Sequence, residues 1–298
     1  MPGKLGLMSP AKAVRHTLPY LLAHSLALGL VLASLTGETR LRLPFDVLPG
    51  AVYLALLSLP AFAEKSDASG NGADAQAGAY LGPAYTARSS LNFVQPGGTD
   101  MTFSDIAWEG KPFRPPPYYG YRAIYWPSDR YGVMLDFTHI KAVAIKDRAG
   151  QQSGFKDGDR VPAQAPVSDT LKRLEFTHGY NLLTLNVLRR ASMRGPNLIP
   201  YAGVGLGVAI PHVEVQRADR PQSTRTDEYQ ITGPALQLLG GIEWRFGRRL
   251  SLFVEYKLSC AMIRGDLVGG GKVTTNLCTH QLPVGLAVHL RVRAAATP

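Results

Sequence analysis

Residues 201–215 constrain the fold of this chain more than any other stretch. Large apolar residues alternate there with glycine and alanine, so one face of the segment carries bulk and the other carries almost no side chain. A period of two is typical of a β-strand, and a soluble strand would show polar residues on its second face. The bare second face instead suits the crowded lumen of a narrow closed barrel whose outer face touches lipid.

The overall composition agrees with a membrane barrel and excludes a bundle of transmembrane helices. Hydrophobic residues make up 45% of the 298 residues, and the mean hydropathy is only −0.03. Strands that alternate lipid-facing with small or polar positions keep hydropathy this low. The net charge of +10 predicts acidic partners. Basic residues lie mostly in expected loops and turns, which favours anionic lipid over nucleic acid.

The first 63 residues are expected to be a leader. Residues 47–60 are apolar, follow two arginines and end at Ala61-Phe62-Ala63, which is typical of a signal-peptide cleavage site. A second apolar run, 18–35, indicates either a start placed too far upstream or a double leader. The small and polar residues of 64–78 predict a flexible periplasmic lead-in. The barrel is then expected over 79–293, with a C-terminal extension over 294–298.

Eight segments of alternating polarity follow the leader. They span residues 79–89, 118–126, 131–143, 176–190, 198–215, 228–246, 250–263 and 273–292. Short and long connections alternate between them along the chain. The sequence therefore predicts an all-β, eight-stranded antiparallel transmembrane barrel of outer-membrane type, with short periplasmic turns and longer extracellular loops. The absence of an aromatic residue at the end of the last strand argues against this prediction.

The same alternation sorts side chains between lipid and lumen. The bulky apolar set must face lipid, because a narrow lumen has no room for it. The opposite set carries charges that we expect to pair inside the barrel: Arg122, Asp136, Glu243, Arg245, Glu255 and Lys257. Cys260 and Cys278 fall on adjacent strands with lipid-facing parity. A cross-strand disulfide and two inert thiols are both open interpretations.

Histidines gather at the loop-side ends of the expected strands. Parity places a polar patch on the outer wall, at the level of the lipid headgroups: His139, Lys141, Asn181, His212 and Glu214. His178 is expected to point into the lumen, and His280 lies away from the patch. A His-x-Glu pair supplies metal ligands, or a base with its orienting carboxylate. The alternative is the belt of polar and aromatic residues found at that depth in any barrel.

An ordered set of short motifs runs through the expected barrel. It comprises WEGKPF at 108–113, PPYYG at 116–120, LDFTHIK at 135–141, NLLTLN at 181–186, PHVE at 211–214, EYQITGPA at 228–235 and EYK at 255–257. Together these motifs resemble the outer-membrane lipid A oxidases of rhizobial bacteria, over roughly residues 80–290. The long basic loop 146–173, the cysteines and the C-terminus depart from the family pattern.

The resemblance implies oxidation of the proximal glucosamine of 1-dephosphorylated lipid A to 2-aminogluconate. Molecular oxygen would be the electron acceptor and hydrogen peroxide the second product. His139 or His212, oriented by Glu214, is the candidate base for the C1 hydroxyl. Lipid A and lipopolysaccharide of the outer leaflet are the expected partners. Lys141, Asn181, Arg173 and Arg217 are candidates to bind the remaining phosphate or acidic core sugars.

Oxygen reacts slowly with a closed-shell sugar, so a redox group is expected. The chain has no GxGxxG, P-loop, GxSxG or CxxC motif, which argues against flavin and nicotinamide cofactors. A divalent metal held by His139, His212 and Glu214 is the preferred hypothesis. Two rival functions remain: a lipid A deacylase-type barrel, which needs a Ser–His pair, and a non-catalytic lipopolysaccharide-binding or adhesive barrel. All three place the chain in the outer membrane of a Gram-negative cell.

Overall fold

The computed structural model describes residues 74–112, 117–191, 197–247 and 249–291. The expected leader and C-terminal extension lie outside these residues. Two short 3-10 helices, η1 (Val167–Asp169) and η2 (Gln222–Thr224), occur among the strands. Within the described ranges, no helix is long and apolar enough to cross a membrane.

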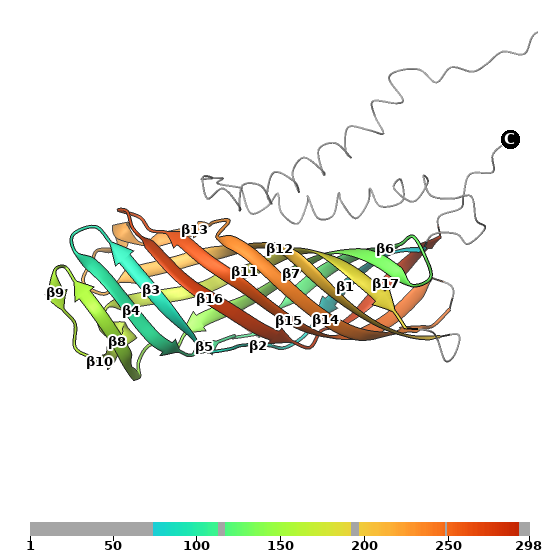
Figure 1. Cartoon of the computed structure of the whole chain (residues 1–298), viewed down its shortest axis with the longest axis horizontal. Coiled ribbons are helices and arrows are strands. Elements are labelled where there is room, and N and C mark those ends of the chain that lie inside the picture. The colour runs from blue at the N-terminus through green and yellow to red at the C-terminus, as the bar shows by residue number, and fades with distance from the viewer. Residues whose placement is uncertain (1–73, 113–116, 192–196, 248, 292–298) are drawn as a thin grey trace, which may run out of the picture.

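The strands form one antiparallel sheet of 17 members that closes on itself into an elongated barrel (Figure 1). In chain order they are β1 (Asp74–Leu81), β2 (Ala84–Thr86), β3 (Ser89–Gln95), β4 (Thr99–Ile106), β5 (Trp108–Glu109), β6 (Tyr119–Trp126), β7 (Tyr131–Ala144), β8 (Ala149–Lys156), β9 (Asp159–Arg160), β10 (Gln164–Pro166), β11 (Leu171–Arg190), β12 (Leu198–Arg217), β13 (Thr226–Tyr229), β14 (Gly233–Arg245), β15 (Leu250–Asp266), β16 (Lys272–Gln281) and β17 (Val284–Arg291).

Eight strand positions make up the membrane wall, as the sequence predicted. The neighbours run β1-β6-β7-β11-β12-β14-β15 and then β17, which pairs back to β1. β16 and β17 are one wall strand that breaks at Leu282 and Pro283, because proline has no N–H for the ladder. The adjoining strand breaks at the same level, between β1 and β2, where Pro83 accepts a hydrogen bond from the Leu282 amide at 3.1 Å.

The first wall strand begins at Asp74, inside the stretch expected to be a flexible lead-in. β1 pairs along its length with β17 and, from Asp74 to Tyr80, with β6. Small residues suit this position, because large side chains fill the lumen beside it. A Cβ at Gly78 would lie 3.3 Å from the Phe253 ring.

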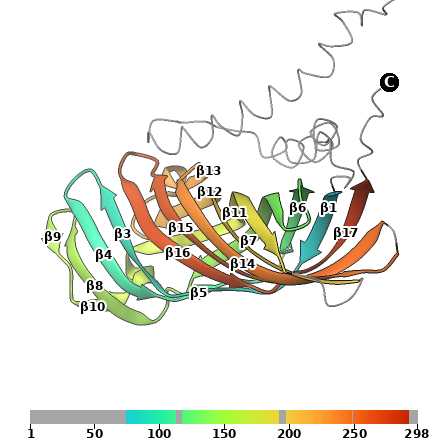
Figure 2. The same cartoon turned by 45° about the vertical axis from the view of Figure 1, so that its right-hand side comes forward.

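Two of the expected extracellular loops are sheet rather than irregular chain. The β3–β4 hairpin and the strands β8 to β10 extend the wall beyond the barrel at the left-hand end of Figures 1 and 2. β4 pairs with β8, which joins the two extensions. An apolar core fills this end; its members include Leu91, Phe93, Met101, Phe103, Trp108, Phe176, Tyr180 and Leu277.

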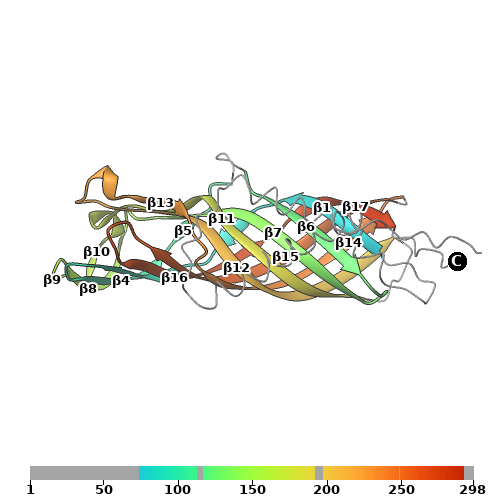
Figure 3. The ribbon, with the colours of Figure 1, turned by 90° about the horizontal axis from the view of Figure 1, so that it is seen from above.

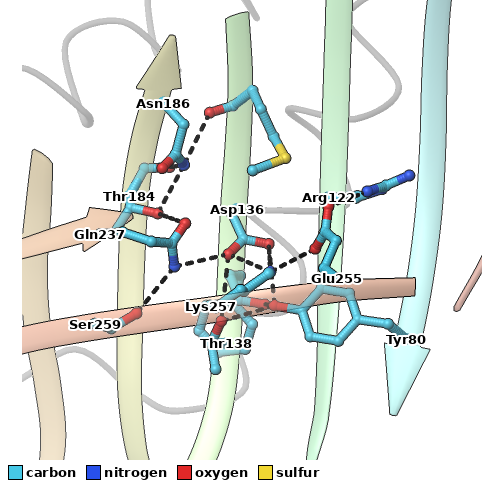
Figure 4. A network of polar contacts seen from close by, with 12 residues as sticks. Tyr80, Arg122, Asp136, Thr138, Thr184, Asn186, Gln237, Glu255, Lys257 and Ser259 are labelled. Atoms are coloured by element: carbon cyan, nitrogen blue, oxygen red, sulfur yellow. Dashed lines mark hydrogen bonds and ion pairs between the residues drawn. The ribbon is translucent and has the colours of Figure 1, made fainter. Parts of the chain in front are cut away.

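Charged side chains fill the narrower part of the lumen, and they pair as predicted. Lys257 from β15 reaches across to Asp136 on β7, with its Nζ 2.8 and 2.9 Å from the two carboxylate oxygens. Arg122 from β6 contacts Glu255 and donates a hydrogen bond to the Tyr201 hydroxyl at 2.7 Å. Figure 4 shows these groups converging from opposite walls, with Tyr80, Gln237 and Thr138 around Asp136.

The outward-facing residues of the wall form an exposed apolar belt. Its members on neighbouring strands include Val133, Leu185, Val187, Val204, Leu206, Leu236, Leu238, Ile242, Val254, Leu282, Leu286 and Val288. A closed sheet with such a belt is the architecture of an outer-membrane barrel, and the protein is located in that membrane. Cys260 and Cys278 lie opposite each other on β15 and β16 and form a disulfide, which decides between the two open interpretations.

Candidate functional site on the outer wall

The outer wall changes character above the apolar belt, on β7, β11 and β12. Leu206 is 69% exposed, whereas Val208 and Ile210, which follow it on the same face of β12, are 2% exposed. They pack with Phe137 under a cover to which Tyr119 and Ile231 contribute. Glu214 lies eight residues beyond Leu206, or about 20 Å along the barrel axis at about 3.3 Å per residue and a tilt near 40°. The covered region therefore lies above the belt.

His139 is buried in this covered region, on the outward face of β7. Its Nδ1 lies 2.8 Å from Oδ1 of Asn181, whose amide nitrogen donates to the Ile210 carbonyl at 3.1 Å. Because the amide orientation makes Oδ1 the acceptor, the His139 proton is assigned to Nδ1. Nε2 is then an acceptor, and it is buried without a hydrogen-bond partner. The ring stacks on Tyr119, with centroids 4.5 Å apart.

A bulge in β11 brings His178 to the outer wall, so its predicted lumen orientation is wrong. Three residues lie between Phe176 and Tyr180 on β11, whereas one lies between their partners Ala142 and Ile140 on β7. Gly179 sits in the bulge with φ of 136°, and a Cβ there would lie 2.6 Å from Asn181 Oδ1. Glycine is therefore required at this position. The bulge breaks the alternation that the parity prediction assumed.

Glu214 is the centre of the polar contacts at this level. Its Oε1 accepts hydrogen bonds from Thr177 at 2.5 Å and from His178 Nδ1 at 2.8 Å. Its Oε2 accepts from Arg225 at 2.6 Å and from Arg173 at 3.3 Å. Burial would raise the pKa of this carboxyl, but the adjoining imidazoles, the Thr177 hydroxyl and the Arg225 charge outweigh burial and hold it well below its ordinary value.

His212 lies between two carboxylates. Its Nδ1 is 3.5 Å from Glu214 Oε1, and its Nε2 is 3.5 Å from Asp227 Oδ1. The His212 ring meets His178 and Tyr229 edge to face, at centroid distances of 4.8 and 4.6 Å. Tyr229 is held in turn by a hydrogen bond from its hydroxyl to the His178 carbonyl. Strand β13, which carries Asp227 and Tyr229, pairs directly with the end of β12 (Figure 3).

The structure brings most of the predicted site residues together, and it separates one. His139, Asn181, His212, Glu214 and Arg173 line the same part of the outer wall, and Lys141 lies there buried to 2% exposure. Arg217 lies elsewhere. It is paired with Asp157 and Asp219, and it lines a separate cavity of about 240 Å³ at the extracellular mouth. Its binding of a phosphate or an acidic core sugar stays a prediction, but three residues beyond Glu214 it is no longer part of the cluster.

Four further residues belong to the site, and the parity analysis missed them. They are His178, Arg225, Asp227 and Tyr229. Arg225 and Asp227 come from the link after β12, outside the expected alternating segments, and Tyr229 lies at the start of the segment expected over 228–246. For His178, Gly179 was the one local signal, since an isolated glycine in a strand pattern often marks a bulge.

The candidate metal ligands also differ from the predicted set. Among the described residues, His178, His212 and Glu214 place donor atoms within 4.8 Å of one another. His139 is not in this group, because its Nδ1 is held by Asn181 and its ring is stacked on Tyr119. His178 therefore replaces His139 in the candidate set.

No family model matches the chain, and no curated protein matches it. Similar solved structures include Neisserial surface protein A (14% identity, 73% of this chain, 97% of that chain, TM-score 0.33). The N-terminal β-barrel domain of Pseudomonas aeruginosa OprF is 11% identical over 73% of this chain and 97% of its own, with a TM-score of 0.32. The Escherichia coli outer membrane protease OmpT is 8% identical over 76% and 100%, with a TM-score of 0.40. Likenesses this weak assign no function.

Proposed function

We propose that this barrel oxidises the proximal glucosamine of 1-dephosphorylated lipid A to 2-aminogluconate, with oxygen as the electron acceptor. The observation that carries the proposal is a buried imidazole nitrogen, His139 Nε2, without a partner on the outer wall above the apolar belt. Acyl chains of a neighbouring glycolipid occupy the level of that belt, so its sugar lies at the level of the cluster. A substrate would reach this level by moving sideways in the outer leaflet, and the Tyr119 ring stacked on His139 would have to move aside for the sugar to contact Nε2.

The proposed oxidation balances in atoms and electrons. The ring-closed sugar loses the C1–H hydrogen and the C1 hydroxyl proton, which leaves a lactone. Two electrons and two protons convert O2 to H2O2, and water opens the lactone to the gluconate. His139 is the candidate base for the hydroxyl proton, because its Nε2 is the acceptor nitrogen and Asn181 holds Nδ1.

The surrounding charges fit a lipid that has lost its 1-phosphate. The two arginines nearest Glu214 share its single carboxylate, and Arg173 is also paired with Glu175. The Arg173 side chain is 41% exposed and can meet acidic groups elsewhere on the glycolipid. A neutral C1 hydroxyl suits the uncharged acceptor that His139 offers.

The hydrogen bonds of the site favour oxidation over deacylation. A deacylase-type site needs a serine hydroxyl beside a histidine. In the described ranges, no serine hydroxyl hydrogen-bonds to His139, His178 or His212; their polar neighbours are Asn181, Glu214 and Asp227.

The test is mass spectrometry of lipid A from cells that make 1-dephosphorylated lipid A and express the full chain. The wild type should add one oxygen to the lipid in air and leave it unchanged without oxygen. His139→Gln should lower product at least 100-fold, since removing a general base costs about that much or more. His280→Ala, which changes a histidine on the far strand β16, should retain full activity. Unmodified lipid A in air, or loss of an acyl chain, contradicts the proposal.

A further inference from the structure

The donor atoms of His178, His212 and Glu214 are spaced like the ligands of a first-row metal ion. His178 Nδ1 lies 2.8 Å and His212 Nδ1 lies 3.5 Å from the same carboxylate oxygen, Glu214 Oε1. Ligands at about 2.1 Å from an ion stand roughly 3.0–3.5 Å apart in octahedral or tetrahedral geometry. The remaining separation, between the two imidazoles, is at most 4.8 Å, so closing the set needs only a small side-chain rotation.

An unpartnered buried atom points to the same place. Nδ1 of His212 is buried and has no hydrogen-bond partner, since 3.5 Å is too long for a strong bond to Glu214. A buried polar nitrogen without a partner is costly, and an ion at this position would satisfy it.

The surrounding groups complete the arrangement expected around a metal ligand. Nε2 of His212 faces Asp227, as metal-bound imidazoles usually face a carboxylate or carbonyl with their second nitrogen. The arginines engage Oε2 of Glu214, whereas Oε1 faces the two imidazoles and the Thr177 hydroxyl. The His178 side chain is 62% exposed, so one side of the cluster remains open.

We propose that His178, His212 and Glu214 bind one divalent first-row transition ion with open coordination positions. Two imidazoles and one carboxylate are the ligand set of mononuclear iron oxygenases and suit other ions of that series. The use of this ion in sugar oxidation rests on the proposed function, whereas the binding itself does not. An ion here supplies the redox group that reaction with oxygen needs, beside the candidate base His139.

The test is calorimetric titration of the refolded full barrel in detergent with Zn²⁺, after chelator treatment and removal of the chelator. The wild type should bind one ion, and electron paramagnetic resonance of a Cu²⁺ sample should show nitrogen ligands. His178→Ala and His212→Ala should each weaken binding at least 100-fold, and Asp227→Asn by about 10- to 100-fold. His280→Ala is the matched control and should bind as the wild type does. Heat-modifiable migration on gels checks that each variant is folded.

The outcomes separate the two proposals. A wild-type barrel that binds no Zn²⁺, or that binds equally well after His178→Ala and His212→Ala, overturns the metal site. Binding that depends on these residues, together with unmodified lipid A in the oxidation assay, upholds the metal site and removes the oxidase. Oxidised lipid A from a barrel that binds no ion upholds the oxidase and removes the metal site.

Discussion

Two clusters of buried charge lie in this barrel, one in the lumen and one on the outer wall, and they are built differently. In the lumen, Lys257 and Arg122 face Asp136 and Glu255, so cations and carboxylates balance within the membrane wall. On the outer wall, two arginines and two histidines gather on Glu214, while Glu175 and Asp227 contact the same cations from the edge of the group. Buried polar atoms without partners occur in both clusters: three on Arg122 and Glu255 in the lumen, and one ring nitrogen each of His139 and His212 on the outer wall.

The two clusters illustrate two roles of buried polar groups: the lumen ion pairs stabilise the fold, and the outer-wall cluster is suited to binding and reaction. Groups that converge from opposite strands of the lumen hold the wall together, and they are closed to any ligand. Groups on the outer wall are held by local contacts along three adjacent strands, and one of them, His178, is exposed. Removing a lumen charge should therefore cost stability, whereas removing an outer-wall imidazole should chiefly affect binding and reaction.

The largest effect is expected from Lys257→Met. The change leaves Asp136 as an uncompensated buried charge and should lower the free energy of unfolding by about 3–5 kcal/mol. Urea unfolding in lipid vesicles, followed by tryptophan fluorescence, measures it. The double variant Lys257→Met with Asp136→Asn removes the lone charge and should recover much of the loss. A single variant within about 1 kcal/mol of the wild type would show that the lumen pair is not structural.

A smaller effect, which depends on pH, is expected from Glu214→Gln. Loss of the charge-assisted hydrogen bonds from Arg225 and Arg173 should cost about 2 kcal/mol at pH 7. The pKa of Glu214 is lower in the folded protein than its ordinary value of 4.5. Its contribution is therefore complete above that value and is lost as pH falls through the lower folded value.

The gap between wild type and Glu214→Gln should accordingly narrow as the pH is lowered below about 4.5 in the same unfolding assay. Glu109→Gln serves as the control, because the Glu109 side chain is 54% exposed and forms a surface ion pair with Lys111 at 3.3 Å. It should change stability by less than about 0.5 kcal/mol at either pH. A gap that widens in acid would mean that Glu214 is not held as a carboxylate.

The smallest effect is expected from the aromatic cover of the outer-wall cluster. Tyr119→Leu removes the ring stacked on His139 and should cost about 1 kcal/mol of unfolding free energy. Tyr121→Leu is the comparison, because that ring neighbours Tyr119 but is 37% exposed. Equal losses from both changes would show that the stack on His139 has no special contribution.

The alternation of apolar with small or polar residues predicted the wall and the lumen, because it depends on which face of each strand contacts lipid. The charges of the lumen, the number of wall strands and the outward placement of His212 followed from that one period. The extracellular hairpins were missed, although Leu91, Phe93, Met101 and Phe103 alternate with polar residues and mark two further strands.

Two features of the site could not be predicted from the sequence, for different physical reasons. A bulge changes the facing of His178 without changing the residues around it, apart from Gly179. Arg217 donates a hydrogen bond to Asp157, which lies 60 residues away in sequence on the extracellular extension. Such a pairing depends on the tertiary fold, and no spacing along one strand reveals it.

The register of the wall continues through the breaks at Pro83 and Pro283: Tyr80 pairs with Gly285 below them and Tyr85 pairs with His280 above them in the same frame. The frame shifts by one residue only farther out, where Phe93 of β3 pairs with Val273. The tips of the extracellular hairpins lie beyond this shift, so an insertion there shifts no residue of the membrane wall. Evolution can lengthen or rewrite the surface seen by phages and antibodies while the lipid-embedded half stays the same.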